Sequence, residues 1–287
     1  MRKLSITDWF FVLLAVAVVA GGGIMVFAKS APPMQHQNMG AVVPAAHSDG
    51  LSDTESGYRL EPVTTPGARG AAVPVAFRIL DSTGKPVTRF LDNQTKQMHF
   101  FSVREDMAVF EHLHPVLEGD TWHTAVSLPD GGVYRLFAEF VPLDTADPRH
   151  PVVLGLPFSV PGDTTIAAVP APADGVTATD GYTVQRVDRG ELKPLSAHEL
   201  RLSIRAPDGT PVSSLEPHLG ANGHMTGFHT MLLSATHLHP VELAGIPLNN
   251  GELSFQAVFA DRGEYRLFLE FVHGGKLRRA AFTVGVA

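Results

Sequence analysis

Six histidines recur at matching positions along this chain, and they are the side chains best suited to chemistry. They are His99, His112 and His114, followed by His224, His237 and His239. Cysteine is absent, so a metal site here must use imidazole, thioether or carboxylate groups. Neutral imidazole binds copper and zinc well. The repeated pattern therefore predicts a three-histidine metal cluster in each copy.

The spacing of the histidines suits a β-hairpin. Residues 98–103 and 107–114 are runs of apolar and aromatic residues that meet at Glu105-Asp106. A two-residue turn there would pair His99 with His112 and place His114 diagonally on the same face. The second copy gives the corresponding pairing of His224 with His237. A slip of one residue would send histidines to opposite faces, so the predicted sites depend on the register.

Copper is the favoured metal, with zinc as the alternative. Met98, Met225 and Met231 stand near the histidine motifs, and thioethers suit copper. Met98 and Met225 are not at equivalent positions in the two copies, so neither is a firm ligand. The segment 30–54 adds further candidates, or incidental linker residues: Met34, His36, Met39 and His47.

The histidines lie inside a longer internal repeat. The sequence YRLFAEF at 134–140 corresponds to YRLFLEF at 265–271. Short β-branched and aromatic runs separated by turn residues predict antiparallel strands in both copies. Each YRLF strand follows a D-x-G-x-Y motif that resembles the tyrosine corner of immunoglobulin-like (Ig-like) domains. We therefore expect an all-β chain with two tandem Ig-like antiparallel β-sandwich domains.

An apolar run from Trp9 to Ala28 precedes the repeats. Its 20 residues would form a helix of about 30 Å, the thickness of a bilayer core. Arg2 and Lys3 favour a cytoplasmic start, which places the rest of the chain in the periplasm or at the cell surface. A cleaved signal peptide is the alternative, because Val26 and Ala28 are small, and the protein would then be secreted.

Composition divides the chain into five segments. We predict a signal anchor or signal peptide at 1–29, a flexible tether at 30–54, a first β-sandwich at 55–160, a linker at 161–180 and a second β-sandwich at 181–287.

Several classes of function are disfavoured. A formal charge of −7 gives no basic surface for nucleic acid. His112, His114 and Glu118 match only half of the metal motif of cupin enzymes, and the later histidine of that motif is missing. We therefore expect a metal-binding protein for sequestration or handover rather than an enzyme. The alternative is a non-catalytic Ig-like interaction module with structural histidines and a protein partner in the cell envelope.

The motifs also resemble a group of bacterial proteins. MHFFSV, HLHP and YRLFAEF in the first copy, with GHMTGF, HLHP and YRLFLEF in the second, resemble secreted or membrane-anchored proteins of largely uncharacterised role. Those proteins pair a GH or MH strand with an HLHP or HVHP strand and are often described as heavy-metal-related. The resemblance covers about 57–160 and 181–286. It implies an exported β-sandwich with a link to metals and no established activity.

Overall fold

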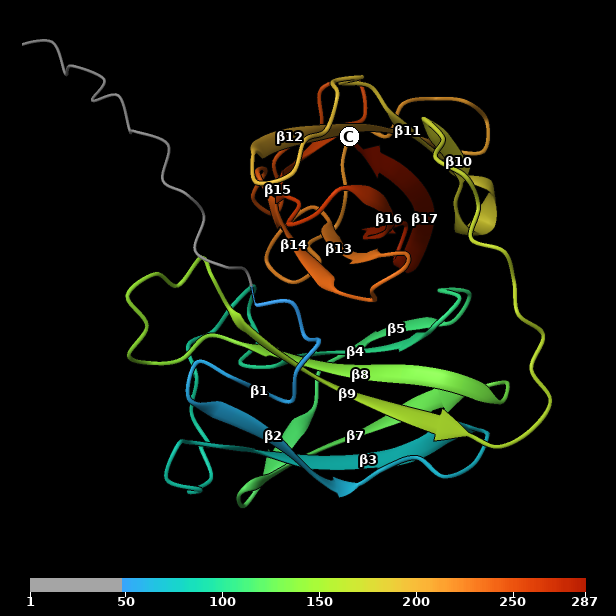
Figure 1. Cartoon of the computed structure of the whole chain (residues 1–287). Coiled ribbons are helices and arrows are strands. Elements are labelled where there is room, and N and C mark those ends of the chain that lie inside the picture. Colours follow the sequence, from blue (N-terminus) through green and yellow to red (C-terminus); the bar gives the residue numbers. More distant parts are fainter. Residues whose placement is uncertain (1–47) are drawn as a thin grey trace, which may run out of the picture. The chain divides into compact units, whose positions relative to one another are not determined.

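The computed structural model describes residues 48–287, and its regular structure is almost entirely antiparallel β-strand (Figure 1). One 3-10 turn at Thr179–Gly181 is the exception within this range. The described part contains no helix with the length and apolar character needed to cross a bilayer. The apolar run 9–28 lies outside the described residues, and so do Met34, His36, Met39 and His47.

The first repeat consists of two sheets packed face to face. One sheet has the order β1-β2-β3-β7-β6, formed by Thr54–Glu55, Tyr58–Thr64, Gly70–Leu80, Thr121–Leu128 and Val116–Glu118. The other has the order β5-β4-β8-β9, formed by Phe110–Leu113, His99–Arg104, Gly132–Phe140 and Val152–Val160. Inward-facing apolar side chains of both sheets, such as Ile79, Phe100 and Leu154, form one buried core.

The second repeat has a similar succession of strands along the chain, but these strands form a single sheet. Its order is β10-β11-β12-β15-β14-β13-β16-β17, formed by Gly175–Thr177, Thr183–Arg186, Ala197–Arg205, Glu252–Val258, Ala235–Pro240, His224–His229, Gly263–His273 and Lys276–Val286. Leu238 of β14 pairs with Met225 of β13 and also with Ala257 of β15, so the ladder is continuous where the first repeat separates into two sheets. The sheet surrounds its own core, which includes Leu202 and Phe282.

Two tyrosine corners occupy equivalent places in the two repeats, as predicted. Tyr134 near the start of β8 donates its hydroxyl hydrogen to the carbonyl of Asp130, at 2.9 Å. Tyr265 near the start of β16 does the same with the carbonyl of Asp261, at 3.1 Å. The motif glycine is required at Gly263, because φ is 131° and an added Cβ would lie 2.6 Å from the ring of His229. The repeat assignment is therefore supported by local geometry as well as by sequence.

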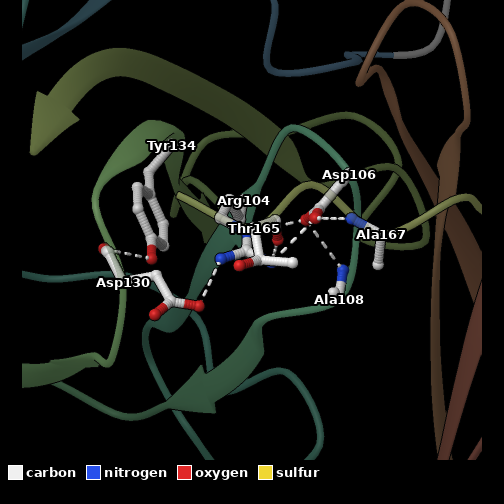
Figure 2. A network of polar contacts seen from close by, with 7 residues as sticks. All are labelled: Arg104, Asp106, Ala108, Asp130, Tyr134, Thr165 and Ala167. Atoms are coloured by element: carbon white, nitrogen blue, oxygen red, sulfur yellow. Dashed lines mark hydrogen bonds and ion pairs between the residues drawn. The ribbon is translucent and has the colours of Figure 1, made fainter. Parts of the chain in front are cut away.

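The start of the linker is held against the first repeat by a buried ion-pair network (Figure 2). Arg104 is 3% exposed and donates to both carboxylate oxygens of Asp106, each at 2.7 Å. Its Nη1 reaches the carboxylate of Asp130 at 2.8 Å, and its Nη2 reaches the carbonyl of Thr165 at 3.2 Å. The amide of Ala167 donates to Asp106 as well. Because every charged group in the network is paired, its burial is compensated.

Residues at the start of the described chain also bond to both repeats. The hydroxyl of Ser48 donates to the carbonyl of Val153 in β9, at 3.0 Å. The carbonyl of Asp49 accepts from the amide of Ala235 in β14, at 2.7 Å. The last part of the predicted tether is therefore in contact with the folded domains.

A third apolar cluster joins the two repeats. Alternation along β4 sends Phe100 into the core of the first repeat and His99 and Phe101 to the opposite face. That opposite face packs against the second repeat, where the rings of Phe110 and Phe268 stack with centroids 4.1 Å apart. The members of the cluster are Phe101, Val103, Met107, Phe110, Phe137, Val153, Phe228 and Phe268. The histidine-bearing face of the first hairpin is therefore an interface between the two repeats.

Candidate functional site

The hairpin that carries the first histidines has a longer loop than predicted. The amide of Arg104 donates to the carbonyl of Val109 at 3.0 Å, which closes a loop over residues 105–108 instead of a two-residue turn. His112 consequently pairs with Phe101, and the expected partner His99 lies two positions away. The second hairpin shows the same shift, because His237 pairs with Thr226 rather than with His224. A shift of two residues preserves the face of every side chain, so the histidines of the first hairpin still share one side.

Three imidazoles meet on that side. One ring nitrogen from each of His99, His112 and His114 lies within 4.8 Å of the others. Ring centroids are 5.2 Å apart for His99 and His112, 5.0 Å for His99 and His114, and 4.8 Å for His112 and His114. The Nε2 atom of His114 is buried and has no hydrogen-bond partner among the described residues. The cluster thus has the convergence that a shared ion requires.

Hydrogen bonds around the cluster fix which nitrogens carry protons. His99 Nε2 lies 2.9 Å from the carbonyl oxygen of Asn93, which only accepts, so this nitrogen donates. His112 Nδ1 lies 2.8 Å from a carboxylate oxygen of Glu270 and donates in the same way. A neutral imidazole has one N–H, so neither ring has a second proton to donate. The remaining nitrogens, His99 Nδ1 and His112 Nε2, nevertheless face each other at 3.0 Å.

A positive species between those two nitrogens would resolve the conflict. An extra proton or a metal ion there would remove the repulsion between the two lone pairs. Burial and the neighbouring His99 and His114 lower the pKa of His112 well below its ordinary 6.5, which disfavours the extra proton. Burial is also the main reason that the pKa of His114 falls to about 4. At neutral pH His112 and His114 therefore offer neutral imidazoles, the form that binds metals.

The second repeat contributes to the same place. His224, the first residue of β13, is 4% exposed, and its ring centroid lies 4.5 Å from that of His112 and 5.4 Å from that of His99. His239 pairs along the backbone with Gln256 of β15, and the side chain of His237 is outside the described set. A separate cluster of the second-repeat histidines therefore stays a prediction.

Two buried glutamates accompany the histidines and were not anticipated. Glu139 in β8 is the cross-strand partner of His99, and Glu270 in β16 is the cross-strand partner of His224. They are 5% and 2% exposed. Glu270 is held by Arg279, whose Nε and Nη2 donate to one carboxylate oxygen at 3.0 and 2.6 Å. An acidic residue inside an apolar strand, in both YRLFAEF and YRLFLEF, was the available sequence signal.

A further histidine of the second repeat, His218, lies near the cluster. Burial lowers the pKa of His218, whose charge also interacts with Glu270 and with His99. The Nε2 atom of His218 is buried without a hydrogen-bond partner in the described range. His229 is 5% exposed, and its Nδ1 accepts from the amide of Met231. His229 is thus a structural residue of the second hairpin loop.

The methionines near the motifs are not on the histidine face. Met98 and Met225 are each 1% exposed and lie in the cores of the first and second repeats. Met231 is 86% exposed at a loop. Within residues 48–287, the three methionines used to favour copper are therefore absent from the cluster, and that part of the argument for copper fails.

Beside the cluster is a cavity of about 10 Å³, roughly the space that one water molecule needs. Its lining includes Glu139 and Val153 from the first repeat and His224 and Thr226 from the second. The cavity therefore lies between the repeats and adjoins the imidazoles.

Comparison with known proteins identifies the family but no activity. A family described as "Domain of unknown function (DUF8832)" matches residues 53–148 and 177–287. No curated protein matches the chain.

Several solved structures show a weak likeness. Domains 4 and 5 of the S-layer protein SbsC are 11% identical with a TM-score of 0.23, covering 82% of this chain and 99% of that one. Trypsin-activated alpha-2-macroglobulin from Escherichia coli is 12% identical with a TM-score of 0.27, covering 84% of this chain and 16% of that one. The Escherichia coli adhesin FdeC is 13% identical with a TM-score of 0.26, covering 82% and 65%. Such low TM-scores carry no conclusion about function.

Proposed function

This chain belongs to the DUF8832 family, and we propose that it is an extracytoplasmic protein that binds a metal ion through its histidine cluster. The observation that carries the proposal is the contact between His99 Nδ1 and His112 Nε2. Both rings donate their only proton to an outer acceptor, Asn93 or Glu270, and so direct lone pairs at each other over 3.0 Å. Metal-binding histidines commonly have this arrangement, with the second nitrogen donating to a carboxylate or a carbonyl.

The distances suit a first-row transition metal. An ion with metal–nitrogen distances of about 2.0–2.1 Å in tetrahedral geometry separates its ligand nitrogens by about 3.3 Å. The 3.0 Å between His99 and His112 is close to this value, and His114 has a nitrogen within 4.8 Å of both. Small side-chain movements are therefore enough to bring three imidazoles onto one ion.

The donor set favours copper(II) or zinc. All three proposed ligands are imidazoles, which suit both ions, whereas copper(I) prefers the thioethers that are missing here. At a given nitrogen site copper(II) binds more tightly than zinc, so copper is favoured and zinc is the alternative. The burial of His99 and the outer hydrogen bonds of His99 and His112 hold these two rings in place, which suits sequestration or handover of an ion.

Metal analysis tests this proposal directly. The full chain, equilibrated with copper(II) or zinc and then desalted, should retain bound metal, and His112→Ala should lose it. His123→Ala is the matched control, because His123 is an exposed histidine on β7 of the same repeat. Equal metal content in wild type and His112→Ala would overturn the proposal.

The second candidate is a non-catalytic interaction module in which the histidines are structural. It is favoured by hydrogen bonds that join the repeats without metal: His112 to Glu270, and Arg279 Nη1 to the carbonyl of Phe110 at 2.8 Å. Under this function His112→Ala should destabilise the chain equally with and without added metal. Sheet order and tyrosine corners support Ig-like domains, which often present loops to partners in the cell envelope.

The proposed location rests on the sequence before the described residues. The apolar run 9–28 would hold the protein at a membrane, with both repeats outside the cytoplasm. The full chain should then partition with membranes. A soluble mature protein beginning just after Ala28 would show that the run is a cleaved signal peptide.

A further inference from the structure

We infer that the two repeats share one metal site, to which the second repeat contributes His224, so that a bound ion holds the repeats together. This inference rests on the proposed metal-binding function. It replaces two independent sites, one in each repeat, by a single site at their interface. The evidence comes from ring positions, from the outer hydrogen bonds and from the apolar packing beside the cluster.

The ring positions fit four imidazoles around one ion. An imidazole centroid lies about 3.2 Å from an ion bound to its nitrogen, so two rings on a tetrahedral ion have centroids about 5.2 Å apart. The centroid separations within the first-repeat set are 4.8–5.2 Å. Those from His224 to His112 and to His99 are 4.5 and 5.4 Å, which fall around the same value. The ring of His224 is therefore close enough to His99 and His112 to become a fourth ligand after a rotation.

One side-chain movement is needed to complete the site. Among the described side chains, the group of nitrogens within 4.8 Å consists of the three first-repeat histidines, so the ring of His224 has to rotate to present a nitrogen. A rotation about a terminal ring torsion has a low cost. The adjoining cavity of about 10 Å³, lined by His224 and Glu139, gives the ring room to turn.

The second repeat already positions a first-repeat ligand. Glu270 in β16 accepts the proton of His112 Nδ1 at 2.8 Å and is itself fixed by Arg279 of β17. Arg279 also donates to the carbonyl of Phe110 in β5 and lies over its ring, with 4.9 Å from guanidinium carbon to centroid. Separation of the repeats would remove these contacts and release the ring of His112. Ion binding and docking of the repeats are therefore coupled.

His218 supplies an independent indication. It comes from the second repeat and is near enough to contribute to the lowered pKa of His112 and of His114, and its buried Nε2 has no hydrogen-bond partner in the described range. Burial of such a nitrogen is unfavourable unless a water or an ion satisfies it. Imidazoles from both repeats are thus gathered around the first-repeat histidine cluster.

Zinc titration calorimetry on the full chain tests the inference, with His36→Ala and His47→Ala in every sample to remove the tether imidazoles. We expect one zinc ion per chain and at least a 10-fold lower affinity after His224→Gln. His237→Ala and His239→Ala are matched controls from β14 and should keep the wild-type affinity. Two ions per chain, one of them lost on His237→Ala, would overturn the shared site.

The outcomes separate this inference from the proposed function. If His112→Ala abolishes zinc binding and His224→Gln leaves it unchanged, the ion belongs to the first repeat alone and the inference fails. If no variant and no wild-type sample binds zinc, both fail. Circular dichroism confirms that each variant is folded.

A distance measurement tests the coupling itself. The chain has no cysteine, so Ser82→Cys and Ser214→Cys place spin labels at two exposed positions, one in each repeat. Zinc should narrow the distance distribution between the labels, and His224→Gln should reduce that narrowing. If the labelled protein without further substitutions binds zinc and its distance distribution does not change, the coupling is refuted.

Discussion

Replacement of Glu270 by glutamine should separate the metal-binding role of the cluster from its structural role. The carboxylate accepts from His112 and twice from Arg279. In Glu270→Gln the carbonyl oxygen can still accept from Arg279, while the new amide donates to His112 Nδ1. His112 then moves its own proton to Nε2 and donates it to His99 Nδ1. Every hydrogen bond is satisfied in the metal-free state, but the nitrogen that would bind the ion is occupied.

The magnitudes follow from these bonds. Charged hydrogen bonds contribute about 1.5–3 kcal/mol and neutral ones about 0.5–1.5 kcal/mol, so losing the charge against the one-third-exposed Arg279 should cost about 1–2 kcal/mol of unfolding free energy. Glu270→Ala removes the acceptor of Arg279 Nε and Nη2 and of His112 Nδ1, and should cost about 3–5 kcal/mol. Zinc affinity should nevertheless fall about 10- to 100-fold in Glu270→Gln, because a residue that orients a metal ligand is altered.

Urea unfolding in the presence of a chelator measures the first quantity, and zinc titration calorimetry measures the second. Wild type, Glu270→Gln and Glu270→Ala should have similar m-values, so that midpoints compare the free energies directly. Wild-type zinc affinity in Glu270→Gln would refute the assignment of protons in the cluster. Equal destabilisation by glutamine and alanine would refute the proposed proton shift of His112.

Three further predictions concern the fold and its dependence on pH. Tyr134→Phe and Tyr265→Phe should each lower the free energy of unfolding by about 1–3 kcal/mol, because each loses a buried hydrogen bond. Tyr58→Phe is the control and should lower it by less than about 0.5 kcal/mol, because its hydrogen bond is exposed; urea midpoints measure all three changes. Phe110→Ala should cost about 3–5 kcal/mol and loosen the contact with Phe268 between the repeats, seen as faster amide exchange in β16; unchanged exchange would contradict the interface. His114 has a folded pKa of about 4, below its unfolded value of about 6.5, so the unfolded chain binds more protons in this window. The contribution of His114 to the free energy of unfolding without metal should be fully present above about pH 6.5 and should be lost as the pH decreases towards about 4. In His114→Asn the urea midpoint should therefore depend less on pH over this range.

Strand periodicity explains why the three first-repeat histidines lie on one side of their hairpin although the predicted register was wrong. Side chains two residues apart share a face, so His112 and His114 had to lie together wherever the hairpin loop was centred. The loop itself was two residues longer than expected. Met107 in this loop adopts a positive φ of 57°, and methionine is not a residue type that predicts this conformation. An even shift kept His99 on the same side.

The same periodicity also shows an error that the sequence alone could have prevented. Met98 precedes His99 directly, and Met225 follows His224 directly. Adjacent residues of a strand point to opposite faces, and both methionines are in the cores of their repeats. Nearness in sequence was therefore evidence against these two as ligands.

The sequence by itself determined the repeat, the tyrosine corners and the face of each first-repeat histidine, because these depend on local turns and on alternation along single strands. Only the tertiary structure decided what covers that face. A face that packs in its own core and one that packs against another domain are equally apolar, so Phe101 and Phe110 did not distinguish them. The contacts that surround His112, from His224 and Glu270, cross between elements distant in the chain. Long-range packing brings these elements together, and a local sequence pattern does not predict such packing.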